Sequence, residues 1–469
     1  MAKGKASKPG IAPEDRLDFK KLLPVFVIVL IDLLGLTIII PLMPLYAVSF
    51  GANAFTIGLL GAAYPMMQFI AAPILGRLSD RYGRKPILLI SQIGTLAGFL
   101  VLGFANSLLM LFLSRIIDGL SGANISTAQA AIADSTNEKN RTQGLGLLGA
   151  AFGIGFVIGP VIAFLSLQAS NNNYHVPAFV AAVFSLLSIL LTWFWFEETL
   201  PAERRGADSQ KSAFSIRAMG EALMRPTVGF LLVLMFSQQI AFGGFEQLLA
   251  LFTLNRMGLN ASGNAIIFVF VGVIVVAVQG GFIGPWSRKF GERRLIYLGL
   301  ALLAVGLTLT ALTPRQPLPG YSKASLEAEM NASGGFRTHE NPTTQNLAVE
   351  LPPDDNNGWF GLVWILAAMV PAAVGGALLQ PSINSMITRK VIKEDVGGIL
   401  GMSAAFLSGA NAIAPLIAGA IFQAFGARAP FLLGGLLMAS LWILAMARIK
   451  PEPGESIPAG MTSPTSGHG

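Results

Sequence analysis

The sequence predicts an all-α membrane protein with twelve transmembrane helices arranged as two pseudo-symmetric six-helix halves. Three observations support this prediction: long apolar runs, a one-sided distribution of basic residues, and an internal repeat. The chain has 469 residues, of which 53% are hydrophobic and 12% are charged. Because soluble domains carry about 25% charged residues, this composition excludes an ordinary soluble enzyme and indicates a polytopic membrane protein.

Twelve apolar runs are long enough to cross a hydrocarbon layer, which takes about 20 helical residues. Prolines inside the runs are compatible with this, since neighbouring helices can satisfy the freed carbonyls. The chain has no cysteine and only three scattered histidines, so we expect no metal and no other cofactor. The predicted spans lie near 22–48, 55–76, 86–105, 108–133, 144–167, 176–196, 227–254, 263–285, 294–313, 359–386, 397–423 and 429–447.

Basic residues predict the orientation. Lys and Arg concentrate in the N-terminal tail and in the loops after even-numbered spans. The opposite side carries only Arg256, Arg315, Lys323, Arg337 and Arg428. By the positive-inside rule both termini are cytoplasmic, and the expected location is a cell membrane, the bacterial inner membrane. Because the basic residues sit in short loops between apolar runs, the net charge of +7 does not indicate a nucleic-acid partner.

Two pairs of segments reveal the repeat. GRLSDRYGRKP (76–86) resembles GPWSRKFGERR (284–294), and GLGLLGAAFGIGFVIGP (144–160) resembles GILGMSAAFLSGANAIAP (398–415). The second pair is further apart than the first, so the second half contains an insertion. The polar stretch 314–358 accounts for it, and we expect a flexible external loop there with no more than a passive role.

The predicted organisation follows from the spans and the repeat. Two such halves that rock around a site near the membrane midplane form an alternating-access transporter. The predicted parts are a cytoplasmic tail 1–21, an N-terminal half 22–196, a cytoplasmic linker 197–226, a C-terminal half 227–447 with the external insertion 314–358, and a cytoplasmic tail 448–469.

Ionisable residues inside the first half are the leading functional candidates. Asp32 lies about midway through its span, where a carboxylate costs about 2.5–3.5 kcal/mol, so it should face the bundle interior. Protonation removes that cost, which suits reversible proton loading. Arg115 and Asp118 share a helix face, and the depth of Arg115 permits a contact with Asp32. Two alternatives stay open: a permanent Arg115–Asp118 ion pair, and a purely structural role for Asp32.

Further polar residues and a run of small residues extend the candidate set. Glu246 continues a polar stripe and is a second candidate for handling a proton or cation, unless it reaches the outer surface. Amides at middle depth either line a substrate cavity or join helices: Gln68, Asn124, Gln129, Gln238, Gln239 and Asn411. Tight packing, and a hinge in addition, is expected at Gly149, Gly153, Gly155, Gly159 and Pro160.

Together these segments resemble the major facilitator superfamily, specifically its twelve-helix drug:proton antiporters, and within them the tetracycline efflux proteins. The similarity covers nearly the whole chain apart from the tails and residues 314–358. It is carried by IDLLGLTIIIPLMP in the first span, by the loop signature G-x-x-x-D-R-x-G-R-[RK] in GRLSDRYGRKP, by LSRIIDGLSGA in the fourth span, by GAAFGIGFVIGP in the fifth and by EETLP at 197–201.

The resemblance implies roles for particular residues. Asp32 would assist proton coupling, and Arg115 would sense its charge. Gly76 would permit a close helix contact, and Asp80 would engage the other half of the molecule. The resemblance implies a cytoplasmic gate made of Gly76, Asp80, Arg81, Gly83, Arg84 and Lys85. Two departures argue against metal–tetracycline exchange: the ninth span contains no acid, and Arg288 stands where the first repeat has Asp80.

The sequence therefore predicts a secondary active transporter, not an enzyme, that exports a drug-like or amphipathic organic solute in exchange for protons. Its partners would be that solute, protons and the lipid bilayer, and it would act as a monomer. No GxxxxGK[ST] motif is present, so ATP hydrolysis is not indicated. Two alternatives remain: proton-coupled uptake of a sugar, carboxylate or peptide, and a non-transporting receptor on the same fold.

Overall fold

Membrane-length helices dominate the computed structural model, which describes residues 19–122, 124–136, 141–205, 220–221, 223–333, 349–391 and 396–449. Within these ranges twelve helical stretches are long and apolar enough to cross a membrane, and they match the predicted spans. Backbone groups in hydrocarbon must bond within their own segment, so runs of this hydropathy form helices. Most of both predicted tails, most of the linker and the middle of the insertion lie outside the described residues.

The N-terminal half contains six spans, of which two are broken. The first span consists of α1 and α2, and the fourth consists of α5 and α6. A short 3-10 turn, η2 (Ala202–Arg204), follows the last helix. The helices are α1 (Phe19–Ile39), α2 (Met43–Ser49), α3 (Ala54–Tyr82), α4 (Arg84–Gly103), α5 (Leu108–Ser121), α6 (Asn124–Asp134), α7 (Arg141–Ala169) and α8 (His175–Phe194).

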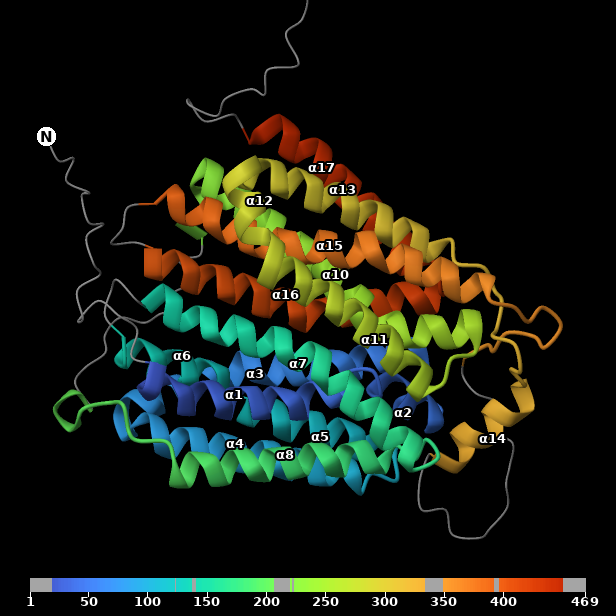
Figure 1. The fold of residues 1–469 in the computed structure, drawn as a ribbon, viewed down its shortest axis with the longest axis horizontal. Coiled ribbons are helices and arrows are strands. Elements are labelled where there is room, and N and C mark those ends of the chain that lie inside the picture. The colour runs from blue at the N-terminus through green and yellow to red at the C-terminus, as the bar shows by residue number, and fades with distance from the viewer. Residues whose placement is uncertain are drawn as a thin grey trace, which may run out of the picture.

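The C-terminal half repeats this plan with an insertion after its third span. Its second span passes through a π-helical stretch, η3 (Ala277–Phe282), that contains two glycines. In Figure 1 the C-terminal helices occupy the upper part and the N-terminal helices the lower part, except that α14 lies at the lower right, beside α2. The helices are α10 (Pro226–Met257), α11 (Ala261–Val276), α12 (Ile283–Phe290), α13 (Glu292–Ala311), α14 (Lys323–Ser333), α15 (Phe360–Arg389), α16 (Val396–Phe425) and α17 (Ala429–Arg448).

Different features mark the two ends of the bundle: Gly83 marks one end and α14 marks the other. At the Gly83 end, Gly83 turns the chain between α3 and α4, and Gly291 does so between α12 and α13. Their φ angles of 109° and 76° lie in the region that only glycine enters at little cost. At the opposite end, called the α14 end, α14 contacts α2 (Figure 1).

The segment 76–86 is helical where a loop was predicted. Helix α3 continues to Tyr82, and α4 begins at Arg84. Gly83 alone makes the turn, so charged residues on both sides of it stay on helices. The prediction of a loop over 76–86 is therefore wrong, because the positive φ of a single glycine reverses the chain without a longer linker.

The two halves touch closely toward the α14 end. Gly58 on α3 lies so near α16 that a Cβ atom there would be 2.3 Å from the carbonyl oxygen of Pro415. Further along the bundle, a Cβ atom at Gly272 on α11 would be 2.6 Å from the carbonyl oxygen of Phe156 on α7. The pairs α3–α16 and α7–α11 therefore form the seam between the halves, with backbone packed against backbone.

The apolar core shows that the two halves are packed together at the α14 end and separated at the Gly83 end. One large cluster joins both halves and includes α2, α10 and α14. The other two clusters belong to one half each, the first around Leu22 and Leu88 and the second around Leu295 and Leu378. Near the Gly83 end, Gly76 has no atom within 4 Å of a Cβ position, and α12 has no buried residue. The close helix contact implied at Gly76 is therefore absent in this conformation.

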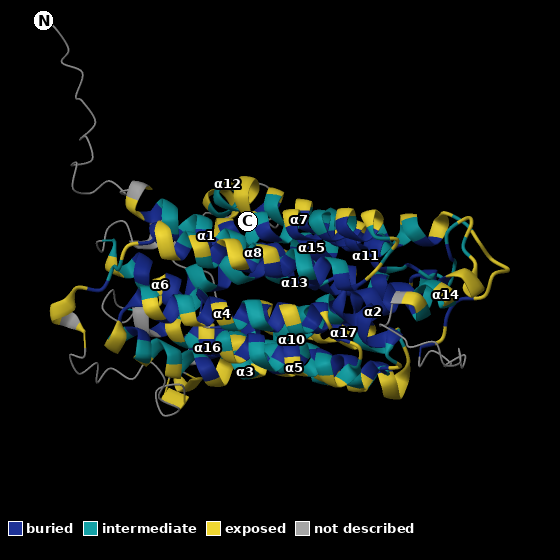
Figure 2. Cartoon of the chain, turned by 90° about the horizontal axis from the view of Figure 1, so that it is seen from below, coloured by how far each residue is buried: buried dark blue, intermediate teal, exposed yellow. Residues whose placement is uncertain are grey.

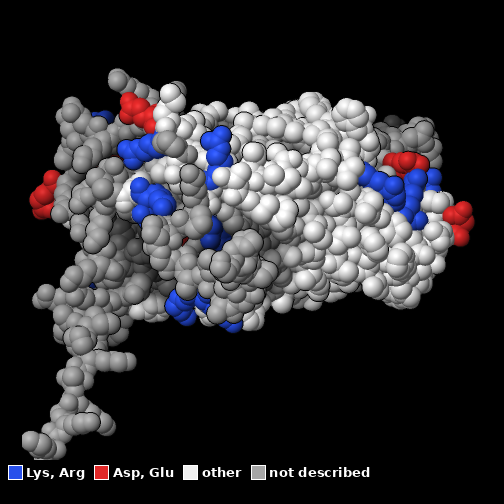
Figure 3. Space-filling view, turned by 90° about the horizontal axis from the view of Figure 1, so that it is seen from above, with Lys and Arg blue, Asp and Glu red and all other residues white. Residues whose placement is uncertain are grey.

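The molecular surface has the banding of a membrane protein. In the view of Figure 3, Lys and Arg side chains lie toward the two ends, with an uncharged belt between them. Large apolar side chains such as Phe194 and Trp193 are exposed to the surroundings. This banding fits twelve helices that cross a hydrocarbon layer.

The insertion is ordered where the structure describes it, at residues 314–333 and 349–358. Helix α14 packs against α2, which is buried along its whole length and dark in Figure 2. Four apolar side chains of the insertion are buried in the shared core: Leu326, Met330, Val349 and Leu351. The expectation of a flexible loop is wrong for these parts, because a few well-placed apolar residues anchor a stretch whose average composition is polar.

Candidate transport site and helix-end network

A polar pocket forms where the fourth span breaks. Helix α5 ends at Ser121, and α6 begins at Asn124, so the break places Asn124 beside α1. The pocket lies within the N-terminal half, between α1, α3, α4 and α5–α6. It is lined by Asp32, Leu33, Leu36, Tyr64, Thr95, Phe99, Asp118, Gly122, Asn124 and Ile125.

Asp32 lies in this pocket and bonds to a neutral partner. The Asn124 side chain donates a hydrogen bond from Nδ2 to Asp32 Oδ2 at 2.8 Å. The other carboxylate oxygen is buried and accepts no hydrogen bond from the described residues. The contact with Arg115 that its depth permits is not formed, and Arg115 pairs with Asp118 instead. Asp32 is therefore an acid without a cationic partner in the described structure.

Arg115 and Asp118 form an ion pair, which is one of the alternatives that the sequence leaves open. Arg115 Nη1 lies 3.3 Å from Asp118 Oδ2, and both side chains are buried. The guanidinium also lies over the ring of Phe99, 5.8 Å from its centre. Gly98 lets α4 pack closely against α5, since a Cβ atom at this position would be 3.0 Å from Asp118 Cβ. Asp118, but not Arg115, belongs to the lining of the Asp32 pocket.

Two polar side chains of the pocket were not predicted from the sequence. Tyr64 and Thr95 line the pocket from α3 and α4. The Tyr64 hydroxyl accepts a hydrogen bond from Gln68 Nε2 at 3.2 Å, and Gln68 also donates to the carbonyl oxygen of Gly122 at 2.7 Å. Gln68 thus ties α3 to the helix break instead of lining the pocket. The signal that could have found Tyr64 is its position one helical turn before Gln68.

The C-terminal half contributes a separate and sparser polar group. Gln239 donates to Asn411 Oδ1 at 2.7 Å, which joins α10 to α16. Gln238 is buried, while Gln129 of the first half is exposed on α6. Glu246 is partly buried on α10 and makes no hydrogen bond or ion pair with any described residue. None of these residues lines the Asp32 pocket.

The glycine run of α7 packs in part as expected. Thr37 on α1 donates a hydrogen bond to the carbonyl oxygen of Gly155 at 2.9 Å, and a Cβ atom at Gly159 would clash with the same threonine. A Cβ atom at Gly153 would be 3.4 Å from Val276 on α11, whereas Gly149 faces open space. Helix α7 therefore packs on α1 through Gly155 and Gly159 and on the other half through Gly153, and Pro160 lies within the continuous helix.

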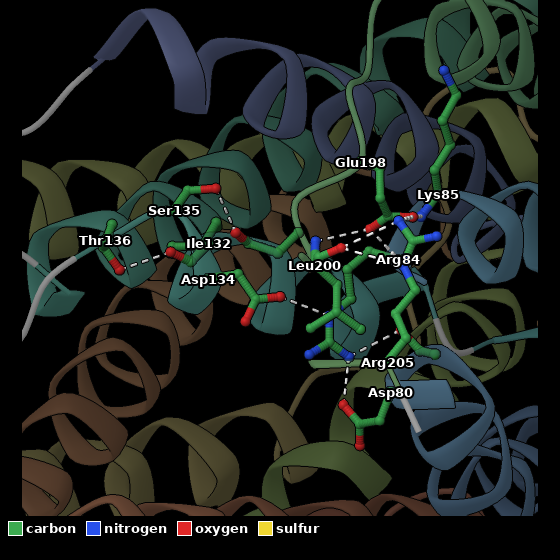
Figure 4. A network of polar contacts seen from close by, with 12 residues as sticks. Asp80, Arg84, Lys85, Ile132, Asp134, Ser135, Thr136, Glu198, Leu200 and Arg205 are labelled. Atoms are coloured by element: carbon green, nitrogen blue, oxygen red, sulfur yellow. Dashed lines mark hydrogen bonds and ion pairs between the residues drawn. The ribbon is translucent and has the colours of Figure 1, made fainter. Parts of the chain in front are cut away.

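A network of charges surrounds the turn at Gly83 (Figure 4). Arg84 is buried and binds two acids: Nη1 lies 2.6 Å from Asp80 Oδ1, and Nε lies 2.8 Å from Asp134 Oδ2. It also donates to Ser79 Oγ at 3.1 Å. All partners belong to the N-terminal half. The engagement of Asp80 with the other half that the resemblance implies is not formed in this conformation.

Glu198 completes the network from the chain that follows α8. Its carboxylate accepts hydrogen bonds from the backbone N–H groups of Arg84 at 2.9 Å and Lys85 at 3.2 Å, at the first turn of α4. The Lys85 ammonium donates to the carbonyl oxygen of Trp193, and Arg81 lies over the ring of Tyr82. An acid suits a helix N-terminus, where backbone N–H groups lack partners. The role of Glu198 was missed, although it lies in the EETLP segment.

Within the described ranges, no three His, Asp or Glu side chains converge as a metal site would require. Asp32 and Asp118 share one pocket, but the Arg115 ion pair already occupies Asp118. What the pocket offers chemically is one carboxylate that can exchange a proton, next to a charged pair.

Comparison with known proteins places the chain among transporters. Tetracycline resistance protein class B of Escherichia coli is 34% identical over 279 residues, which cover 58% of this chain and 68% of the relative. Tetracycline resistance protein class H of Pasteurella multocida is 27% identical, covering 91% and 96%. Multidrug resistance protein 1 of Bacillus subtilis (strain 168) is 27% identical, covering 84% and 87%.

Solved structures share the fold. The nucleoside transporter NupG superposes with a TM-score of 0.63 at 13% identity, covering 93% of this chain and 100% of that one. The human organic anion transporter MFSD10 gives 0.55 at 22% identity, covering 92% and 100%. The family model described as Major Facilitator Superfamily matches residues 25–363 and 357–466. With twelve spans in two halves and a family match over nearly its whole length, the chain belongs to the major facilitator superfamily.

Proposed function

We propose that this protein is a proton-coupled drug exporter: it moves a drug-like or amphipathic organic solute out of the cell in exchange for protons, by alternating access. The Gly83 end faces the cytoplasm and the α14 end faces outward, as the distribution of Lys and Arg supports. The conformation described above is then the inward-facing one. The relatives named for tetracycline and multidrug resistance support export of drug-like solutes.

The observation that carries the proposal is the partner of Asp32. A cation beside a carboxylate favours its charged form and opposes protonation. Asp32 is held instead by the neutral Asn124. An ionised carboxylate in the membrane interior is costly, and protonation removes that cost. Asp118 lies in the same pocket, so the charge on Asp32 acts on the Arg115–Asp118 pair. Protonation of Asp32 can therefore change the balance of forces between α1 and α5.

The proton exchange supplies the energy for export. One charge that crosses a potential of 100 mV provides about 2.3 kcal/mol, and a pH difference adds to it. Glu246 is a second acid without a described partner and joins Asp32 in the proposed coupling. The Gln239–Asn411 pair and Gln238 lie in the other half, where they offer hydrogen bonds to a solute. The protein works as a monomer, since one chain contains both halves.

The test replaces Asp32 in inverted membrane vesicles with an imposed pH gradient. Asp32→Asn should abolish proton-driven movement of tetracycline and ethidium, because the side chain keeps its shape but loses its proton. Glu350→Gln, which alters an exposed acid at the α14 end, is the matched control and should transport like the parent. Retained proton-driven transport in Asp32→Asn, with normal protein levels, would refute the role. The lumen of an inverted vesicle corresponds to the outside of the cell. Proton-driven movement of the solute from the lumen to the medium would instead favour a symporter.

A further inference from the structure

The insertion that follows α13 connects the two halves at the outer end. Its base is tied to the C-terminal half: Asn255 of α10 donates to the carbonyl oxygen of Glu350 at 2.8 Å, and Arg256 donates to that of Thr313. Its two arms are tied together, since Tyr321 donates to the carbonyl oxygen of Pro352 at 3.0 Å. The insertion is thus a built part of the C-terminal half.

The tip of the insertion lies on the N-terminal half. Helix α14 contacts α2, which belongs to the first span. Two α14 side chains, Leu326 and Met330, are buried, with Met330 fully inaccessible. They belong to the same apolar core as Tyr46 of α2. Helix α14 has 11 residues and is held on the opposite half by buried apolar side chains. Separation of α14 from α2 would expose this apolar surface to water and therefore costs free energy.

A polar contact beside this apolar one also spans the halves. The Glu329 carboxylate of α14 accepts hydrogen bonds from Asn260 Nδ2 at 3.0 and 3.2 Å, and Asn260 caps the start of α11 in the C-terminal half. The same carboxylate is hydrogen-bonded by Asn172, which lies between α7 and α8 in the N-terminal half. The Asn172 side chain is also bonded by Ser262 of α11. Glu329 therefore sits where the insertion and both halves meet.

Opening of the outer end must break these contacts. It would separate α3 from α16, which touch at Gly58 and at the start of α3, where Ala54 donates its N–H to Gln423 of the other half. As α2 leads into α3, it would move with α3 away from the C-terminal half. Helix α14 cannot keep its base on one half and its tip on the other.

We propose that α14 is an outer clasp, which holds the external gate shut by docking on α2 and Asn172 and must undock before the outward-facing state forms. The clasp sets the equilibrium between inward- and outward-facing states without touching the solute. The proposal rests on one part of the proposed function, namely that the outer end of the bundle opens and closes. Gate opening can be read without solute or proton gradient, so failure of the clasp and failure of the exporter are separable.

The first test measures opening with a single introduced thiol. The chain contains no cysteine, so Ala54→Cys at the buried α3–α16 contact is the only thiol. Its alkylation by a membrane-impermeant maleimide added outside reports the outward-open fraction. Met330→Ala should raise the labelling rate about tenfold or more, because truncation of a fully buried side chain on the docked helix weakens docking. Leu326→Ala should act in the same direction.

The matched control is Tyr321→Phe. It removes a hydrogen bond inside the insertion and leaves the contact with α2 intact. Labelling in this variant should equal that of the parent. An equal rise in Tyr321→Phe and Met330→Ala would show that any loosening of the insertion has this effect, and would overturn the clasp. An unchanged rate in Met330→Ala, in protein that is folded by size-exclusion chromatography, would also overturn it.

The second test fixes the clasp. Cysteines at Asn172 and Glu329, joined by a short bifunctional methanethiosulfonate, should stop external labelling of a third cysteine at Ala54 and restore it on reduction. The control pair, cysteines at Asn255 and Glu350, joins the insertion to its own half and should leave labelling unchanged. Unimpeded labelling with the Asn172–Glu329 link complete would contradict the proposal.

Discussion

The two halves build the same turn with opposite charges. In the N-terminal half, Arg84 follows Gly83 and binds Asp134 at the end of α6. In the C-terminal half, Glu292 follows Gly291 and binds Arg389 at the end of α15, at 2.6 Å. A serine five residues earlier supports both, as Ser79 accepts from Arg84 and Ser287 donates to Glu292. The repeat preserves the geometry of an ion pair and not its sign.

The inversion has a consequence at the helix N-terminus. Glu292 is itself the first residue of α13, where an acid is favourable. Arg84 is the first residue of α4, where a cation is not, and Glu198 supplies the missing acid from outside the helix. Only the N-terminal half adds a partly exposed acid, Asp80, to the pair. The comparison teaches that the pair ties helices within each half, and that Asp80 is an exposed addition to it in the N-terminal half.

The largest expected effect comes from reversing the N-terminal charge. Arg84→Glu places three acids together and leaves Asp134 without its cation, which should lower the free energy of unfolding by about 3–5 kcal/mol. Adding Asp134→Arg recreates the arrangement of the C-terminal half and should recover most of the loss. Thermal unfolding in detergent measures both, with Arg77→Glu on the exposed face of α3 as control. A double variant no more stable than the single one would show that the sign does matter.

Loss of the external acid should have a smaller effect. Glu198→Ala leaves the first N–H groups of α4 without their acceptor, at a cost of about 1–2 kcal/mol. In the background of Arg84→Glu and Asp134→Arg the same change should cost less, because the introduced glutamate caps α4 itself. Unfolding measurements on the two backgrounds give the difference. Equal costs would mean that Glu198 acts through Arg205, its neighbour at 3.9 Å, and not through the helix end.

Asp80→Asn should leave stability nearly unchanged while it slows transport. The Asp80 side chain is 43% exposed, and ion pairs of this kind are worth about 0–1 kcal/mol. Transport should fall because closure of the cytoplasmic end loses an acid that can reach the other half. Arg288→Gln, at the equivalent position of the repeat, is the control and should transport normally. Slow transport in both variants would make the two turns equivalent and remove the asymmetry.

The smallest expected effect concerns the outer end, where only the C-terminal half has an insertion. Burial raises the pKa of Glu329, although hydrogen bonds from Asn260 and Asn172 oppose the shift. A raised pKa means that docked α14 binds the proton more tightly than free α14 does. Docking is therefore favoured at low external pH and weakens as the pH rises through the pKa of Glu329. Burial and the charge of Glu329 raise the pKa of Tyr174, so this tyrosine stays neutral in this range.

The corresponding measurement is external labelling of the Ala54→Cys reporter between pH 5 and pH 8. The reactivity of the thiol itself changes with pH, so the rate is divided by that in the Glu329→Gln background. The ratio should rise toward pH 8, because docking loses the stabilisation that comes from protonated Glu329 as this carboxyl ionises. A flat ratio would mean that Glu329 does not titrate with docking.

Much of the fold followed from the sequence because hydropathy and charge act along the chain. The twelve spans, the repeat and the Arg115–Asp118 pair needed only local spacing. The partner of Asp32 did not follow, because it depends on the end of α5 at Ser121, and a Ser-Gly pair within an apolar run is weak evidence for the end of a helix. Glu198 and Asp134 were missed because their contacts with Arg84 join residues far apart in the chain.

The insertion was misread for a different reason. Average composition described residues 314–358 as polar, yet a few apolar side chains such as Leu326 and Met330 decide where α14 packs. Disorder follows from too little buried apolar surface, and that surface belongs to the folded neighbour as much as to the segment. The sequence of the insertion alone does not reveal that α2 provides this apolar surface.

The position of α14 also bears on inhibition. Under the proposed orientation this helix lies on the outside of the cell, at the joint between the two halves. A macrocycle or antibody fragment that recognises the docked helix together with α2 would arrest the cycle without crossing the membrane. Such a molecule would act from outside the cell and would not compete with the transported solute for its binding site.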